Sequence, residues 1–415
     1  MNNVLAVTFI TAWHTTLPLI PVYAASLGAA PLIVGLIVSS NVALPLLLAI
    51  HVGAAADRFG TARIARWSAI LFVVSYLLVV TSPSLGLLAL GLAGVGLADL
   101  GLVVAVQTYV ATSSAPENRD RNFAYLTIWI SLGALVGPVL GGFLADHWGF
   151  RAAFAGSMTF AALTLLITRT LPEVQRTRAD PVAPSSGTMQ TLRQAATLLN
   201  DPGVSFVLLT NAALMFATSV RQSFFPLYLR DVGFSTTLIG VIFSLNSLCQ
   251  MAIRPMIAPA VREFRHAGVL AVALCLAIVG LAITPRLTSF WALAAAFSLV
   301  GVGNGFMQPL TMSLVSGRAA AGMRGLAIGL RMTGNQFAQV IGPPCFGLIV
   351  GAFGLGAAFQ VGAIIAAIGL APIIRLSRAL ATPLGIDRTI TRRKDDQHAG
   401  AHSESSEGVL GRPGG

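Results

Sequence analysis

Apolar residues in this chain come in long runs, and polar residues gather in the short segments between them. A helix that crosses a bilayer needs about 20 predominantly apolar residues, and Gly and Pro are tolerated within it. The weakly alternating segments of a membrane β-barrel are not seen. The pattern predicts an all-α membrane protein with twelve transmembrane helices, at 4–25, 31–55, 64–82, 85–112, 122–146, 151–171, 203–229, 236–258, 267–285, 288–315, 325–350 and 354–374.

Composition agrees with a chain dissolved in a lipid bilayer. Of the 415 residues, 55% are hydrophobic and 10% are charged, and the mean hydropathy is +0.79. A soluble domain has about 25% charged residues. The cysteines Cys249, Cys275 and Cys345 lie in separate apolar runs without the spacing of a disulfide or a metal site. We therefore expect no metal and no cofactor.

The basic residues predict the orientation of the chain. With the N-terminus placed inside, 21 of the 26 Lys and Arg fall in inner segments, and three fall in outer loops, namely Arg151, Arg230 and Arg286. The positive-inside rule then places both termini in the cytoplasm and the protein in the cell membrane. The net charge of +11 is explained by topology, so we expect no nucleic-acid partner.

The chain overlays itself without a gap when it is shifted by 205 residues. "PVYAASLG" (21–28) then meets "PLYLRDVG" (226–233), and "VGPVLGGF" (136–143) meets "IGPPCFGL" (341–348). One offset across six runs predicts two parallel six-helix pseudo-repeats. Such repeats place a substrate site at their interface near the membrane midplane and rock against each other.

The repeat divides the chain into four parts. We expect an N-terminal six-helix bundle (1–171), a cytoplasmic linker with a short amphipathic helix (172–202), a C-terminal six-helix bundle (203–375) and a disordered cytoplasmic tail (376–415). Asp201 is the predicted N-cap of the seventh helix, with Pro202 in its first turn.

"GAAADRFGTAR" (53–63) resembles the signature loop of the major facilitator superfamily, Gly-x3-Asp-Arg-x-Gly. The resemblance implies the twelve-helix fold of that family and a contact of Asp57 with the start of helix 11, which latches the inner side. The arginines could instead be simple topology anchors. The predicted cytoplasmic gate comprises Gly53, Asp57, Arg58, Gly60, Arg63 and Arg324.

"GALVGPVLGG" (133–142) in the fifth helix resembles the antiporter motif of the same family. The resemblance implies a proton-coupled exporter, as in the drug exporters of the family. Glycines spaced four apart also make a flat face for tight helix packing, and a proline bends the helix, so generic packing is the alternative. The motif residues are Gly133, Gly137, Pro138, Gly141 and Gly142.

One departure from the family limits the mechanism. Its proton-coupled exporters usually carry an arginine in helix 4, shortly before a glycine, and here that segment reads "LLALGLAGVG" (87–96). Proton coupling through such an arginine is excluded.

Asp99, in "GVGLADLG" (94–101), is the one acid of fifteen that lies deep in a predicted span. An ionised acid there costs at least about 2.5–3.5 kcal/mol on insertion scales. An acid in low dielectric exchanges its proton nearer neutral pH than one in water, which suits handling of protons or of a cationic substrate. The alternative is a structural hydrogen bond or ion pair. His14 is the second proton-coupling candidate, or else an interhelical hydrogen bonder.

Arg221 either binds an anionic group of a substrate or has a structural partner, because an unpaired arginine in a span is expensive. Arg331, two turns into its helix, can snorkel to the inner surface. The other polar or aromatic side chains that we expect to face a central cavity are Thr11, Gln107, Trp129, Gln222, Asn304, Gln308, Asn335 and Gln336.

No constellation of an enzyme is found, because the sequence has no glycine-rich phosphate loop and no nucleophile with a matched base. We expect a monomeric secondary transporter that exports small, fairly apolar compounds, a drug or a metabolite, in exchange for protons. A permease that imports a small anionic or polar metabolite is the alternative. A non-transporting sensor or scaffold of the same fold is the third hypothesis.

Overall fold

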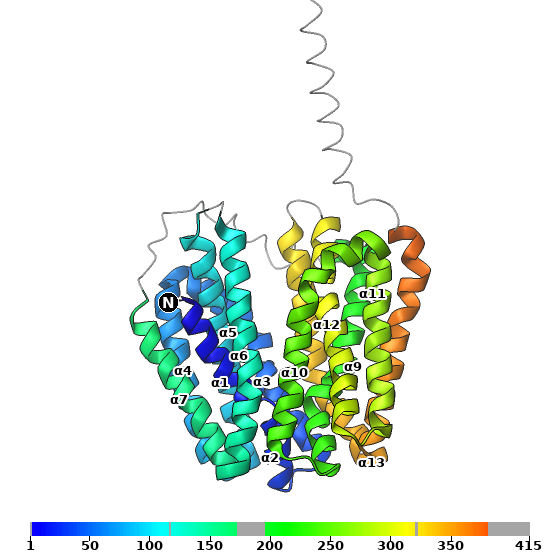
Figure 1. Cartoon of the computed structure of the whole chain (residues 1–415). Helices are drawn as coiled ribbons and strands as arrows, with labels where there is room; N and C mark the ends of the chain where they lie inside the picture. The colour runs from blue at the N-terminus through cyan, green and yellow to red at the C-terminus, as the bar shows by residue number, and fades with distance from the viewer. Residues whose placement is uncertain (1, 116–117, 172–195, 320–322, 381–415) are drawn as a thin grey trace, which may run out of the picture.

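The computed structural model describes residues 2–115, 118–171, 196–319 and 323–380. Within these ranges the chain is helical and contains no β-strand. The helices form two bundles that stand side by side, one from each half of the sequence (Figure 1). The all-α prediction is therefore confirmed.

Within the described residues, the N-terminal bundle holds six membrane crossings. The first is interrupted at Leu17 and Pro18, so that it consists of α1 and α2. A proline has no N–H to continue the helical ladder, which explains the interruption. The elements are α1 (Asn2–Thr16), α2 (Leu19–Ser26), α3 (Pro31–Phe59), α4 (Thr61–Thr81), α5 (Leu85–Ser113), α6 (Arg119–Trp148) and α7 (Phe150–Arg169).

The C-terminal bundle contains two very long apolar stretches. Thr236–Arg286 has 51 residues and Leu326–Leu370 has 45, each more than twice the length of about 20 residues that one crossing needs. The backbone breaks inside each, at Arg265 and at Gly354, and with these breaks the described residues make twelve crossings. The elements are α9 (Pro202–Asp231), α10 (Thr236–Ile253), η2 (Arg254–Met256), α11 (Ile257–Ile283), η3 (Thr284–Arg286), α12 (Phe290–Arg318) and α13 (Arg324–Leu380).

The duplication is visible in the backbone. The described residues with positive φ form three pairs that are 205 positions apart, namely Gly28 with Gly233, Gly149 with Gly354, and Gly60 with Arg265. Glycine adopts this conformation without steric cost, whereas an arginine does not. The second half therefore keeps the turn of the signature loop although it has lost the glycine.

The duplication is also visible in the contacts between helices. The Asn41 side chain donates a hydrogen bond to the carbonyl of Leu92 (3.2 Å), and its counterpart Asn246 donates to the carbonyl of Phe297 (2.9 Å). Gly96 and Gly301 leave the space that these asparagines occupy. The same amide–glycine contact thus fixes equivalent helix pairs in both halves.

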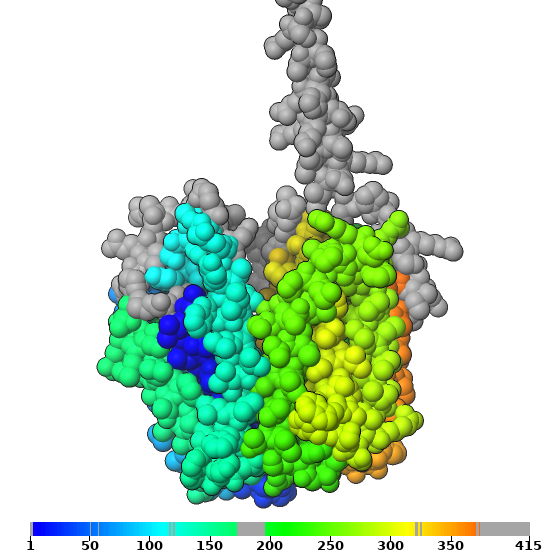
Figure 2. All heavy atoms as spheres, viewed as in Figure 1, coloured from blue at the N-terminus to red at the C-terminus, as the bar shows by residue number. Residues whose placement is uncertain are grey.

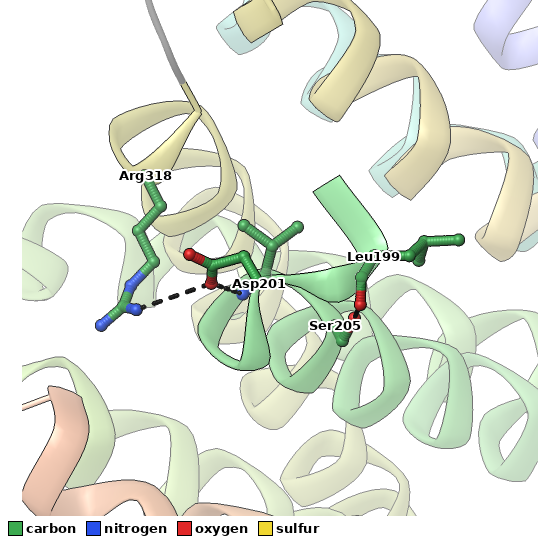
Figure 3. Close-up of polar contacts among 5 residues, drawn as sticks. Leu199, Asp201, Ser205 and Arg318 are labelled. Carbon is green, nitrogen blue, oxygen red and sulfur yellow. Dashed lines mark hydrogen bonds and ion pairs between the residues drawn. The ribbon is translucent and has the colours of Figure 1, made fainter. Parts of the chain in front are cut away.

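Asp201 caps α9 as the sequence predicts. Its carboxylate accepts a hydrogen bond from the backbone N–H of Val204 (2.8 Å), and Arg318 at the end of α12 lies 3.9 Å from the same oxygen (Figure 3). Pro202 occupies the first turn, where its missing N–H is not needed. The carboxylate therefore holds together the ends of two helices of the C-terminal bundle.

Most of the predicted linker and almost all of the predicted tail lie outside the described residues, as does most of the expected amphipathic helix. The predicted boundaries at 171 and 203 fall next to the end of α7 and the start of α9. The divisions between the four parts stay predictions.

The two bundles contact each other mainly along two helix pairs, α6 with α10 and α3 with α13. Among the described residues, most hydrogen bonds between the halves lie where α6 ends and α10 begins, and two more, from Ser244 to Leu135 and from Arg254 to Ser131, lie farther from that end. At the opposite end the bundles stand apart, and Figure 2 shows the separation between them in the upper part of the view. A space between the halves is therefore closed at one end of the molecule.

Candidate functional site

A cavity of about 250 Å³ lies between the halves. Both bundles contribute to it, through α1, α3 and α5 on one side and α9 and α13 on the other. The volume approaches the lower end of the range for sites that bind small molecules. Its lining consists of Trp13, Asn41, Val42, Pro45, Gly96, Asp99, Leu100, Val103, Gln222, Gln336 and Gln339.

Asp99 is the acid in this lining. Its Oδ1 atom is buried and has no hydrogen-bond partner among the described residues. Buried polar groups in proteins are nearly always paired, so an unpaired oxygen on an acid that lines a cavity calls for an explanation. The geometry leaves the carboxyl free to take up a proton or to meet a donor group of a ligand.

The rest of the polar lining is made of amides. Gln222 comes from α9, and Gln336 and Gln339 come from α13, with the two α13 side chains 3.5 Å apart. Each amide can donate and accept hydrogen bonds, and none carries a charge. The cavity therefore combines one acid from the N-terminal half with neutral amides, one of them Asn41 of α3 and the other three from the C-terminal half.

Trp13 supplies the aromatic surface of the cavity. It also lines an adjoining space of about 20 Å³, next to Leu17 at the break between α1 and α2. Interrupted helices at the interface of two repeats are typical of substrate sites in secondary transporters. The break therefore lies beside the cavity.

Three polar or aromatic residues of the cavity lining were not among the sequence candidates, namely Trp13, Asn41 and Gln339. The repeat carries a signal for one of them, because Asn41 and Asn246 align within "VGLIVSSN" and "IGVIFSLN". For Trp13 and Gln339 the sequence offers no comparable signal, because a helical side chain faces the cavity or the lipid according to the rotation of its helix.

Of the predicted candidates, the structure brings Asp99, Gln222 and Gln336 together in the cavity lining. His14 and Thr11 lie instead where α1 packs on α6. A Cβ atom at Gly137 would lie 2.8 Å from Cβ of His14 and 2.9 Å from the Thr11 carbonyl oxygen. Both stay predictions as functional residues.

Arg221 is engaged inside the C-terminal bundle. Its Nη1 donates to Oδ1 of Asn246 (3.0 Å), and its guanidinium lies 4.8 Å from the centre of the Phe297 ring. Arg331, which is 5% exposed, donates to Gln308 (3.0 Å) and contacts Thr311 (3.4 Å). Neither arginine meets a carboxylate within the described residues.

The other candidates have varied surroundings. Asn335 accepts a hydrogen bond from Asn211 inside the C-terminal bundle, and Asn304 is buried with its Oδ1 unpaired. Trp129 and Gln107 are exposed on α6 and α5. Their assignment to the substrate path stays a prediction.

The fifth-helix motif packs on two partners. Gly133, Gly137 and Gly141 leave room for α1, whereas Gly142 leaves room for the carbonyl of Thr236 on α10. The motif thus packs α6 against α1 within the N-terminal bundle and against α10 of the C-terminal bundle.

The signature loop forms the turn between α3 and α4 at Gly60, and Arg58 lies over the ring of Phe59. The side chains of Asp57 and Arg324 lie outside the described part of the structure. The inner latch therefore stays a prediction.

A family model described as "Major Facilitator Superfamily" matches residues 4–235 and 207–385. The chain belongs to the major facilitator superfamily. It is accordingly a multi-pass membrane transporter built from two repeats, as its sequence predicts.

Its curated relatives include drug-resistance proteins. The quinolone resistance protein NorA of Staphylococcus aureus is 24% identical over 343 residues, which cover 81% of this chain and 84% of NorA. The multidrug resistance protein MdtG of Klebsiella pneumoniae is 26% identical over 234 residues, or 55% of this chain and 56% of MdtG.

Solved structures share the fold at low identity. A point mutant of the nucleoside transporter NupG has a TM-score of 0.79 at 14% identity and covers 90% of this chain and 98% of its own. A bacterial homologue of the human lysosomal transporter Spinster, in an inward-facing and unoccupied conformation, has a TM-score of 0.71 at 15% identity and covers 94% and 96%. These likenesses bear on the fold alone.

Proposed function

We propose that this transporter exports small, fairly apolar compounds from the cytoplasm in exchange for protons. The observation that carries the proposal is Asp99, an acid that lines the cavity between the halves and whose buried Oδ1 has no hydrogen-bond partner among the described residues. The positive-inside rule places both termini in the cytoplasm, and the end at which the halves separate then faces inward.

The exchange uses one carboxyl for two tasks. A proton that enters from outside neutralises Asp99 and removes the cost of an unpaired charge in low dielectric. On the inner side the proton leaves, and a substrate enters beside the carboxyl, with Trp13 and the amides as its other contacts. Rocking of the halves then changes the side of the membrane to which the cavity is open.

The relatives support export over the other hypotheses. Both NorA and MdtG are named for resistance, and the fifth-helix motif resembles that of the exporters. The importer hypothesis depends on Arg221, whose guanidinium is held by Asn246 and Phe297 in the C-terminal bundle. No observation favours the sensor hypothesis over transport.

Accumulation in everted membrane vesicles tests the proposal. A panel that includes a quinolone and a lipophilic dye is added, and an imposed pH gradient drives uptake. Asp99→Asn keeps the shape of the side chain, but its amide cannot bind and release a proton as a carboxyl does. It is expected to lower gradient-driven accumulation by about 100-fold or more, the loss typical of removing a general acid or base.

Glu263→Gln is the matched control, because it removes an exposed acid in the segment before the Arg265 turn. Its accumulation should equal that of the parent. Unchanged gradient-driven flux in Asp99→Asn would contradict the coupling role. Uptake into right-side-out cells that fails in Arg221→Ala, with no export, would favour the importer.

A further inference from the structure

Two seams join the halves, and they share one geometry. We call the contact of α6 with α10 the polar seam and the contact of α3 with α13 the bare seam. In the polar seam Gly240 lies against the carbonyl of Pro138, and in the bare seam Gly35 lies against the carbonyl of Pro343. The members of each pair are 205 positions apart, so the seams are related by the repeat.

A second glycine contact repeats in the same way. Gly142 faces the carbonyl of Thr236 in the polar seam, and Gly347 faces the carbonyl of Pro31 in the bare seam. A side chain at any of these glycines would collide with a backbone atom of the other half. Both seams therefore close by direct contact of main chains.

The seams differ in their hydrogen bonds. In the polar seam, Asp146 at the end of α6 accepts from the backbone N–H of Thr236 (2.9 Å) and of Thr237 (2.7 Å). The hydroxyls of both threonines also donate to this carboxylate. Farther along, Ser244 donates to the carbonyl of Leu135 (2.5 Å). No hydrogen bond crosses from α3 to α13 among the described residues.

The start of each helix explains the difference. An α-helix leaves its first four N–H groups without a partner inside the helix. In α10, the N–H of Ile239 makes the first intrahelical bond, to the Ser235 carbonyl. Of the N–H groups before it, that of Leu238 donates to the Ser235 hydroxyl, and those of Thr236 and Thr237 donate to Asp146. Two of the three N–H groups from Thr236 to Leu238 are thus satisfied by an acid of the N-terminal bundle.

The bare seam has a different solution at the same positions. There α3 begins with Pro31, which has no N–H to donate, and the counterpart of Asp146 is Gly351. A threonine opposite an acid in one seam thus corresponds to a proline opposite a glycine in the other. The two differences between the seams are chemically consistent, because a carboxylate at this position is stabilised only where N–H groups of the facing helix can donate to it.

We propose that Asp146, Thr236 and Thr237 form a latch that holds the halves together at the end of the molecule where α6 ends and α10 begins. The bare seam also joins the halves at that end, through glycine contacts and without a hydrogen bond between the described residues of α3 and α13. Rocking of the halves must break the latch before the cavity opens there. A carboxylate at a helix N-terminus, bonded to two N–H groups and two hydroxyls, resists this step more than glycine contacts do. The latch therefore favours the conformation seen here.

Distances between two spin labels test the latch. After the three native cysteines are replaced, labels are placed at Trp148 and Trp291, which are exposed ends of α6 and α12 in opposite halves. Asp146→Ala should raise the population with a longer label distance by at least about tenfold over the parent. That is the change expected from losing one hydrogen bond to a charged acceptor.

Gly351→Ala is the matched control. It alters the equivalent position of the bare seam, where an added Cβ meets nothing within 4 Å. Its distance distribution should equal that of the parent. The double substitution Asp146→Gly with Thr236→Pro converts the polar seam to the proline–glycine kind and should give the same shift as Asp146→Ala.

An unchanged distance distribution in a monodisperse Asp146→Ala protein would overturn the proposal. If that variant does not fold, Thr237→Val removes one donor and keeps the side-chain shape, and it should give a smaller shift in the same direction. No shift in that variant would also overturn the latch. The measurement needs no substrate and no pH gradient, so it stands apart from failure of the exporter proposal.

Discussion

The two halves of this transporter share a scaffold and differ in what they enclose. In the N-terminal bundle several interior hydroxyls satisfy one another, and the acid Asp99 has a buried Oδ1 without a partner among the described residues. Thr16 lies 2.7 Å from the Ser157 hydroxyl and 3.3 Å from that of Tyr76, and Thr164 donates to Thr8 (3.0 Å). In the C-terminal bundle the corresponding interior holds two arginines surrounded by amides, threonine and an aromatic ring.

The different residues at one pair of matched positions illustrate this contrast between the halves. Thr16 and Arg221 are 205 positions apart, yet one is a neutral hydroxyl in a satisfied network and the other is a cation held by Asn246. At the matched positions of Asp99 and Asn304 the charged residue is in the N-terminal half and the neutral one is in the C-terminal half, which is the reverse of Thr16 and Arg221. Duplication preserved the backbone requirements, and individual side chains then made the halves chemically unequal.

The largest effect on stability is expected where the scaffold is shared. Gly96→Ala places a methyl group against the backbone of Asn41, and Gly301→Ala places one against the Asn246 side chain. Overpacking of this kind lowers the free energy of unfolding by about 1–3 kcal/mol. We expect Gly96→Ala to cost more, because a backbone yields less than a side chain. Thermal unfolding of the purified variants in detergent measures both.

Gly86→Ala is the control for the glycine comparison, because a Cβ there meets nothing within 4 Å. It should leave the melting temperature unchanged or raise it slightly. Equal melting temperatures for Gly96→Ala and the parent would show that the helices slide apart easily. The amide–glycine contact would then not be a shared constraint.

A smaller effect is expected where the halves have diverged. Arg265 adopts φ 55° at the position that Gly60 occupies in the first half. Together with its ψ of 167°, this is a backbone conformation that is essentially confined to glycine and costs other residues about 1–3 kcal/mol, so Arg265→Gly should stabilise the protein by about 1 kcal/mol. Gly60→Ala should destabilise it by a similar amount. Opposite shifts in melting temperature check the pair, and shifts of the same sign would contradict this account.

The smallest effect concerns the helix caps. Ser84 accepts from the N–H of Leu87 and Ser289 from that of Ala292, both at 3.4 Å. Each serine-to-alanine change should lower the free energy of unfolding by about 0.5–1 kcal/mol, the usual value for an N-cap. The two losses should add, because the sites lie in different halves. Melting curves of the single and double variants test this, and strong non-additivity would show coupling between the bundles.

Much of the fold followed from the sequence, for a simple reason. A chain in lipid must satisfy its backbone within each crossing, so length and hydropathy predict the helices. The constant offset of 205 predicts the two halves, and positive-inside counting predicts their orientation. The sequence also predicted Asp201 as the N-cap of α9, because a cap depends on residues that are close in the chain.

The site was less predictable. Asp99, Gln222 and Gln336 were expected in a cavity and line one, whereas Trp13 and Gln339 were missed. Arg221 was left between an anion site and a structural partner, and its contacts with Asn246 and Phe297 are now visible. Asp146 drew no attention in the sequence, because its partners at Thr236 and Thr237 are about 90 residues away in the other half.

The sequence by itself determined which segments cross the membrane, that they form two repeats and that one acid is carried into lipid, because each of these depends on local composition or on a fixed offset. Only the tertiary structure decided which side chains share a cavity and which helix ends meet across the seams. Those relations depend on how each helix is rotated and how closely the bundles approach. Both are set by packing between residues far apart in the chain.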